Sequence, residues 1–120
     1  MAFPTSEELV KGVAGREVTY RPEKYFQYSN LGFTMAGAVV AAASGQPYAD
    51  YVRANLLGPL GLTSTWSEMP PEERGKRLAM GYSGIDRDGN RHPMPFYQTK
   101  AMAPAAGYAS TVQEIGRAHV

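Results

Sequence analysis

The sequence of 120 residues has no cysteine, almost no surplus of charge of either sign and no long hydrophobic run. The absence of cysteine excludes disulfide bonds, thiolate zinc sites, iron–sulfur clusters and a cysteine nucleophile. The 12 basic and 11 acidic side chains leave a formal net charge of +1, which is too small to argue for nucleic acid or an anionic membrane as the main partner. The longest weakly polar stretch, residues 31–43, is shorter than the roughly 20 residues that span a bilayer.

The first residues also lack a secretory signal. Met1 to Pro4 have neither the basic start nor the apolar middle of such a segment. We therefore expect either a cytosolic protein or a chain whose true N-terminus is missing. With 43% hydrophobic and 19% charged residues, the composition is that of a soluble globular domain, and the length allows one domain or part of one.

Capping and stop residues predict four helices. Thr5 and Glu8 have the spacing of a capping box, Gly45 is a typical helix stop, and Pro47 suits a first helical turn. The helices are expected at residues 6–13, 31–43 and 48–56, with a last one capped by Ser110 or Thr111.

The helix at residues 31–43 has the clearest pattern. Apolar residues such as Leu31 and Val39 recur at helical spacing, and most of the circumference is apolar. Gly32 and Gly37 would each weaken an isolated helix by about 1 kcal/mol, so we expect them to allow close approach of a neighbouring element. An all-round apolar helix needs neighbours on several faces, and we expect it to be partly exposed if this chain is only a slice of a larger protein.

The segment between Tyr82 and Phe96 contains Asp88-Gly89, a strong hairpin-turn dipeptide. We predict a short β-hairpin there, with a strand near residues 78–82. The same segment superficially resembles a calcium loop, but its glycine has the wrong offset and Tyr97 stands where a bidentate glutamate is required. The fold class predicted from these patterns is mainly α with a short β-hairpin.

Of the motifs in this sequence, the triplet Tyr28-Ser29-Asn30 has the side chains best suited to catalysis. Tyr28 lies immediately before a predicted helix N-terminus, where free N–H groups and the helix dipole favour a nearby anion. A neighbouring ammonium would favour the phenolate further, and a phenolate can act as a general base. Asn30 offers both a donor and an acceptor for orienting other groups. A packed tyrosine followed by an ordinary Ser/Asn cap is the alternative for the triplet taken alone.

The surroundings of the triplet resemble a known family. Residues 22–33 (Pro-Glu-Lys-Tyr-Phe-Gln-Tyr-Ser-Asn-Leu-Gly-Phe) resemble the P-G-x-x-F-x-Y-S-N-x-G-[YF] segment of the serine beta-lactamase-related family, which includes class C beta-lactamases, penicillin-binding D,D-peptidases, D-aminopeptidases and esterases. Residues 43–48, 55–63 and 104–111 resemble three further blocks of that family, in family order. Two departures are Glu23 for a glycine and Ala106-Gly107-Tyr108 for Gly-Gly-leucine; the second could alter a site wall.

The resemblance implies nucleophilic acyl transfer at a serine. In this family the serine belongs to an S-x-x-K motif, and the lysine, the tyrosine of Y-x-N and a K-T-G or H-x-G strand complete the site. Tyr28 is thereby expected to be the base or proton relay, and Asn30 the orienting amide. The implied substrate is a small molecule or peptide, namely a beta-lactam, a D-amino peptide or an ester. No metal or organic cofactor is implied, and His92 and His119 lack partners at zinc spacing.

The other catalytic motifs of the family are absent from this sequence. No serine is followed by lysine at the third position, and neither K-T-G nor H-x-G occurs. We therefore expect residues 1–114 to be part of a beta-lactamase-related domain, mainly the helical lobe of the α/β fold, and inactive alone. The family is usually exported or associated with the cell envelope, which favours a periplasmic, envelope or extracellular location for the intact parent. Membrane association is left open.

The end of the chain has a separate interpretation. Residues 115–120 (Ile-Gly-Arg-Ala-His-Val) resemble the translation of a widely used short-read sequencing adapter. We interpret them as a read-through artefact and assign His119 no role; a genuine Gly-Arg-Ala-His ending is the alternative. The functional alternatives are a short non-catalytic helical module for binding or regulation, derived from the same fold, and an unrelated small helical protein.

Overall fold

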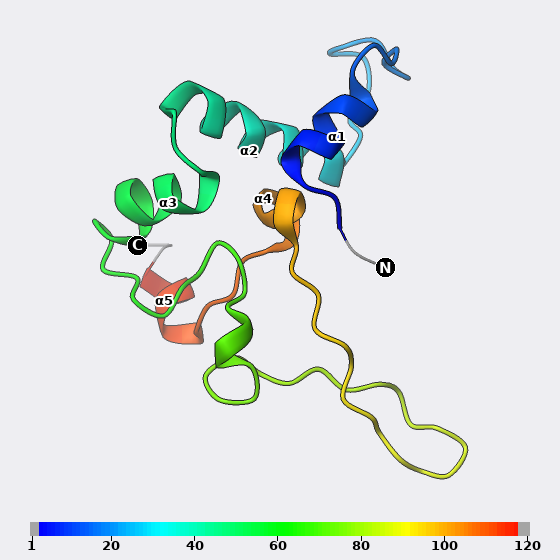
Figure 1. Ribbon diagram of the computed structural model, residues 1–120, viewed down its shortest axis with the longest axis vertical. Coiled ribbons are helices and arrows are strands. Elements are labelled where there is room, and N and C mark those ends of the chain that lie inside the picture. The colour runs from blue at the N-terminus through cyan, green and yellow to red at the C-terminus, as the bar shows by residue number, and fades with distance from the viewer. Residues whose placement is uncertain (1–2, 118–120) are drawn as a thin grey trace.

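The computed structural model describes residues 3–117, and the part of the chain that it describes is helical with long connecting loops (Figure 1). In chain order the elements are α1 (Ser6–Val13), α2 (Asn30–Ser44), α3 (Tyr48–Val52), the π-helical turn η1 (Arg53–Leu57), the 3-10 turns η2 (Pro71–Glu73) and η3 (Lys100–Met102), α4 (Ala103–Ala106) and α5 (Val112–Arg117). The proposed artefact at residues 115–120 lies partly in α5, and its last three residues lie outside the described part.

Capping residues fix the first two helices as the sequence predicts. In α1 the Glu8 N–H donates to the Thr5 hydroxyl at 3.2 Å, and the Thr5 N–H donates to the Glu8 carboxylate at 2.8 Å. In α2 the Gly32 N–H donates to the Ser29 hydroxyl at 3.0 Å. Gly45 ends α2 in the left-handed region, with φ 67°, where a residue without a Cβ is favoured. The predicted helix at residues 6–13 is confirmed, and the one predicted at residues 31–43 is confirmed with one further residue at each end.

The third predicted helix is only partly correct. Residues 48–52 are α-helical, but residues 53–57 form a π-helical turn. Val52, Leu57 and Leu62 are buried together with the partly buried ring of Tyr48, so this turn places Leu57 in the small core. The last helix is capped by Thr111, whose hydroxyl accepts from the Glu114 N–H at 3.3 Å, as one of the two alternatives predicts.

The predicted β-hairpin is not confirmed, and the predicted strand at residues 78–82 is not formed. Within residues 3–117 there are isolated bridges, one of them between Tyr82 and Pro93, but no β-strand. Two backbone hydrogen bonds, Ser83 N–H to His92 O and Met94 N–H to Gly81 O, each 2.8 Å long, join the two arms. Pro93 has no N–H to donate, and glycines weaken strands. The arms therefore run as a loop that extends away from the helices (Figure 1).

Helix α2 packs one face against α4 and η3 and leaves the opposite face exposed. Thr34 and Gly37 are its buried residues, whereas Val39 is 64% exposed. The expected partial exposure of this helix is confirmed. The whole chain exposes 9288 Å², compared with about 6,300 Å² for a folded protein of 13.0 kDa. The radius of gyration of 17.2 Å likewise exceeds the about 14 Å of a compact chain of this length.

Gly37 allows α2 and α4 to approach closely. A Cβ at Gly37 would lie 2.1 Å from Cγ of Pro104, whereas a Cβ at Gly32 would meet only the side chain of Ser29, at 3.6 Å. The sequence-based expectation of close approach is thus correct for Gly37 and wrong for Gly32.

We expect Gly37→Ala to destabilise the chain by about 1–3 kcal/mol, because overpacking against Pro104 outweighs the gain in helix propensity of about 1 kcal/mol. Gly32→Ala, in the same helix, is the matched control and should be neutral or stabilising. Thermal unfolding followed by circular dichroism measures both. A Gly37→Ala variant that melts at or above the temperature of the original chain would contradict this packing.

Candidate active site

Tyr28 and Asn30 lie on either side of the residue that caps α2. Tyr28 is 62% exposed, and its ring packs against Phe33 with the ring centroids 5.8 Å apart. Asn30 is the first residue of α2, and its backbone carbonyl accepts from the Thr34 hydroxyl at 2.8 Å. Its side-chain amide is exposed. Local helix capping therefore presents a phenol and an amide at one end of the same helix.

The electrostatic setting of this end favours an anion. The first turn of α2 has no acidic residue, so the partial positive charge of the helix N-terminus is not neutralised within the turn. Within residues 3–117 the Tyr28 hydroxyl has no hydrogen-bond partner. The packing of the ring against Phe33 restrains Tyr28, while its hydroxyl is available to an incoming group.

A tight turn at residues 21–24 precedes the Tyr28-Ser29-Asn30 triplet. The Lys24 N–H donates to the Arg21 carbonyl over 3.4 Å, Pro22 is the second residue of the turn, and Glu23, the third, has φ 63°. This is the pattern of a type II turn, which favours glycine at the third position. The family glycine at this position thus has a conformational reason, and Glu23 keeps the turn at some energetic cost.

Glu23→Gly is expected to stabilise the chain by about 1 kcal/mol, because glycine adopts the left-handed region without the clash that Cβ causes. Thermal unfolding measures the change. Gly45→Ala, at φ 67° with open space around a new Cβ, is the reverse control and should destabilise the chain by a similar amount. An equal or lower melting temperature for Glu23→Gly would show that the turn is not strained.

Tyr108 contacts the start of α3. Its hydroxyl lies 2.9 Å from the hydroxyl of Tyr48, and partial burial together with this hydrogen bond raises the pKa of Tyr108. The preceding Gly107 is enclosed: a Cβ there would lie 2.6 Å from the Ser67 carbonyl oxygen and 2.7 Å from the Ala103 Cα. The departure from Gly-Gly-leucine therefore adds a tyrosine pair between α3 and the chain after α4. The suggestion that it alters a site wall stays a prediction.

Glu114 is a structural carboxylate that the sequence patterns do not single out. It is 7% exposed, accepts the Ser64 N–H at 2.9 Å and the Thr65 hydroxyl at 2.6 Å, and so joins α5 to residues 64–65. An acidic residue in the first turn of a helix is the only sequence signal for it.

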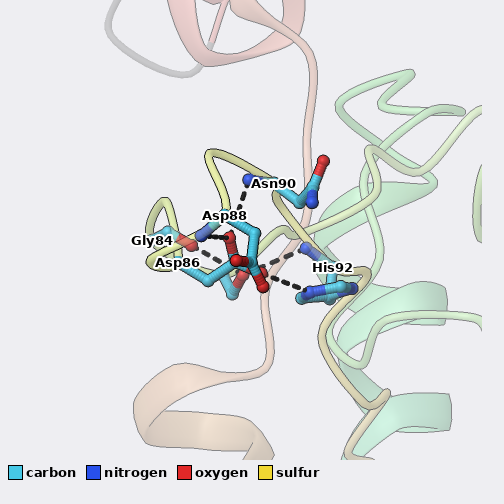
Figure 2. Close-up of polar contacts among 6 residues, drawn as sticks. Gly84, Asp86, Asp88, Asn90 and His92 are labelled. Atoms are coloured by element: carbon cyan, nitrogen blue, oxygen red, sulfur yellow. Dashed lines mark hydrogen bonds and ion pairs between the residues drawn. The ribbon is translucent and has the colours of Figure 1, made fainter.

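The loop at residues 83–92 is held by one carboxylate (Figure 2). Asp86 accepts the N–H groups of Asp88 at 3.0 Å and Asn90 at 2.8 Å, and its second oxygen lies 2.8 Å from Nε2 of His92. The backbone hydrogen bond from Asn90 and the side-chain bond from His92 lower the pKa of Asp86. The carboxylate is thus used for turn formation, and no group of three candidate metal ligands occurs within residues 3–117.

A groove of about 720 Å³ lies between α1, α2 and the segment of η3 and α4. Small apolar residues such as Ala38, Ala41 and Ala101 line most of it, with Lys11 and Lys100 among its charged residues. Neither Tyr28 nor Asn30 lines the groove, so it is separate from the candidate site. None of the described helices combines the length and the apolar character needed to cross a membrane.

Comparison with known proteins places these elements in one family. The family model described as beta-lactamase matches residues 1–119. The human protein beta-lactamase-like 1 is 33% identical over 91 residues, which cover 75% of this chain and 17% of that protein.

The fold of this chain is similar to that of solved structures of penicillin-binding-protein-like and amidase proteins. The octameric penicillin-binding protein homologue from Pyrococcus abyssi has 27% identity and a TM-score of 0.77, covering 96% of this chain and 26% of that one. The D-amino acid amidase from Ochrobactrum anthropi SV3, complexed with D-phenylalanine, has 28% identity and a TM-score of 0.69. The match covers 95% of this chain and 35% of the amidase chain. The chain thus spans about a third or less of the length of these relatives. With the family model matching almost its full length, this chain belongs to the beta-lactamase family.

Proposed function

We propose that this chain is an internal part of a serine hydrolase that cleaves an amide, beta-lactam or ester through a serine acyl-enzyme. Tyr28 is its general base or proton relay, and Asn30 orients the reacting groups. The observation that carries the proposal is the placement of an exposed phenol, restrained by Phe33, at the N-terminus of α2 in the family's Y-S-N sequence. The amidase among its relatives supports the same reaction class.

The proposed reaction begins with transfer of the serine hydroxyl proton to the oxygen of Tyr28. The serine oxygen then forms a bond to the substrate carbonyl carbon, and backbone N–H groups stabilise the resulting oxyanion. When the tetrahedral intermediate collapses, the bond to the leaving nitrogen or oxygen breaks, and that atom takes the proton from Tyr28. A water molecule repeats the sequence on the acyl-enzyme and releases the carboxylic acid.

The position beside a helix N-terminus suits Tyr28 to this role, because the partial positive charge there attracts an anionic group. A lysine ammonium from the proposed S-x-x-K motif would assist proton transfer to the Tyr28 oxygen. Asn30, one residue beyond the cap, can donate to a substrate carbonyl and accept from the lysine at the same time. The sequence contains no S-x-x-K serine, so we propose that the nucleophile belongs to another part of the protein and that this chain is inactive alone.

The test compares this 120-residue chain with the product of the full-length gene. A chromogenic phenyl ester, a D-amino acid anilide and a beta-lactam serve as substrates, and mass spectrometry detects the acyl adduct. We expect turnover and an adduct on a serine only with the full-length product. Equal turnover by the 120-residue chain would refute the assignment of the nucleophile. A full-length product that forms no adduct with any of them would favour a non-catalytic module instead.

A further inference from the structure

The loop in Figure 2 contains two aspartates whose carboxylates differ in what they bind. The carboxylate of Asp86 accepts the N–H groups of Asp88 and Asn90 and contacts Nε2 of His92. Within residues 3–117 the carboxylate of Asp88 accepts no hydrogen bond and forms no ion pair. Asp88 and its neighbours on both sides are exposed. The side chain of Asp88 is therefore free to rotate toward the backbone that follows it.

Gly89, the next residue, leaves its backbone nitrogen accessible. Glycine has no Cβ to shield the nitrogen, and no atom lies within 4 Å of a Cβ built at this position. The Gly89 N–H donates to the Asp86 carbonyl over 3.2 Å, which is the long end of the usual range for such a bond. A free carboxyl group thus lies one residue before a weakly held, unshielded amide nitrogen.

We propose that Asp88–Gly89 is a site of spontaneous modification, at which Asp88 converts to isoaspartate and opens the turn that Asp86 holds. In the first step the Gly89 nitrogen bonds to Cγ of the protonated Asp88 carboxyl group. One water molecule leaves, formed from a carboxyl oxygen and the protons of the carboxyl and amide groups, and a five-membered succinimide ring remains. Water then adds to the main-chain carbonyl carbon of Asp88, the bond from that carbon to the Gly89 nitrogen breaks, and the main-chain carbon becomes a free carboxyl group. The mass of the chain is unchanged, and no oxidant or reductant is needed.

The converted main chain no longer fits the turn. It passes through Cβ and Cγ of residue 88, which lengthens it by one C–C bond of about 1.5 Å. The turn is closed by two hydrogen bonds, from the Asp86 N–H to the Asn90 carbonyl at 2.9 Å and from the Asn90 N–H to the Asp86 carboxylate at 2.8 Å. A longer chain between these partners cannot keep both bonds in place. This inference concerns the loop alone and does not depend on the proposed function.

The first experiment follows isoaspartate in the 120-residue chain during incubation at neutral pH and physiological temperature. Peptide mapping by mass spectrometry locates it, and a carboxyl methyltransferase specific for isoaspartate measures its amount. We expect at least about 10-fold more at Asp88 than at Asp50, because Tyr51 carries a Cβ beside its nitrogen and lies within α3. Asp88→Glu, which loses no contact and would have to close a six-membered ring, should remove most of the methylation. Equal amounts at Asp88 and Asp50, or unchanged methylation of Asp88→Glu, would overturn the proposal.

A second experiment separates the effect of the structure from that of the Asp-Gly sequence. Arg87→Gly creates a second Asp-Gly pair in the same loop, but there the carboxylate is that of Asp86. We expect this pair to react at least about 10-fold more slowly than Asp88–Gly89, because the Asp86 carboxylate must first release its hydrogen bonds. Equal rates at the two pairs would show that the contacts of the loop do not govern the reaction, and the inference would fail.

A third experiment tests whether the turn opens. Chromatography separates the converted from the unconverted chain, and hydrogen exchange is measured on each. We expect the Asn90 amide to exchange at least about 10-fold faster in the converted chain, because it loses a hydrogen bond to a charged carboxylate. The Gly45 amide, which donates to the Ala41 carbonyl at 3.0 Å, should exchange equally in both. Unchanged exchange at Asn90 would contradict the opening of the turn.

Discussion

Replacement of Tyr28 by phenylalanine in the full-length protein is expected to lower kcat about 1,000-fold with little change in KM. Under the proposed mechanism the substitution removes the oxygen that accepts and returns the proton, and general acid–base catalysis contributes about 100- to 10,000-fold to enzymatic rates. The ring packing against Phe33 is retained, so the fold should be unaffected. Steady-state kinetics with the ester and the anilide, together with the melting temperature, measure the effect.

Tyr25→Phe is the matched control for this prediction. Tyr25 is three residues upstream, is 75% exposed and makes an edge contact with Tyr20, but it lies outside the Y-S-N triplet. We expect its kcat to stay within about threefold of the original value, as is usual for surface substitutions away from the chemistry. If Tyr28→Phe and Tyr25→Phe retained equal activity, Tyr28 would not be the proton carrier.

Replacement of Gly107 by alanine is expected to destabilise the fold by about 3 kcal/mol or more. The new Cβ would lie 2.6 Å from the Ser67 carbonyl oxygen, 2.7 Å from the Ala103 Cα and 2.8 Å from the Thr99 hydroxyl. Two of these atoms belong to the backbone and cannot rotate away, so the segments themselves must separate. The paired hydrogen bonds between Trp66 and Ala109, 2.9 and 3.0 Å long, lie next to this point and should weaken with it.

Gly84→Ala provides the comparison, since nothing lies within 4 Å of a Cβ at Gly84 and its φ is not positive. Chemical denaturation of both variants in the 120-residue chain measures the difference. Because proteins of this size are stable by only about 5–15 kcal/mol, Gly107→Ala can leave the chain largely unfolded. If both variants lost the same small amount of stability, the close packing around Gly107 would be wrong.

The sequence predicts the helices where a local signal decides the structure. The hydroxyls of Thr5 and Ser29 bind free N–H groups at the starts of α1 and α2, and Gly45 permits the left-handed end of α2. These interactions lie within a few residues of one another, so their spacing in the sequence is sufficient. The same local capping fixes the position of Tyr28 and Asn30 at one helix end.

The sequence does not predict what distant contacts decide. The turn at Asp86 forms and the two arms are bridged, but Pro93 and two glycines disfavour extended strands, so no β-strand forms within residues 3–117 and the predicted hairpin is not confirmed. The π-helical turn after Val52 places Leu57 in the core, which residue spacing alone could not indicate. The enclosure of Gly107 and the role of Glu114 likewise depend on segments about 40 to 50 residues away in the sequence.

The family glycine at position 23 shows how a structure explains a sequence pattern. The resemblance identifies Glu23 as a departure, but only the φ of 63° shows that the turn favours a residue without a Cβ. The catalytic roles of Tyr28 and Asn30, by contrast, are proposals that the backbone geometry alone does not explain. Their position at the end of α2 is a property of the described chain, whereas their chemistry requires groups that this sequence does not contain.

The most direct test of the central claim is to sequence the source gene across both ends of this reading frame. We predict an in-frame S-x-x-K upstream and a K-T-G or H-x-G downstream. We also predict that the codons for residues 115–120 are replaced by the continuation of an amphipathic helix. A start codon at Met1 with a stop codon directly after Val120 would contradict the account, because the protein would then have no nucleophile for Tyr28 to serve.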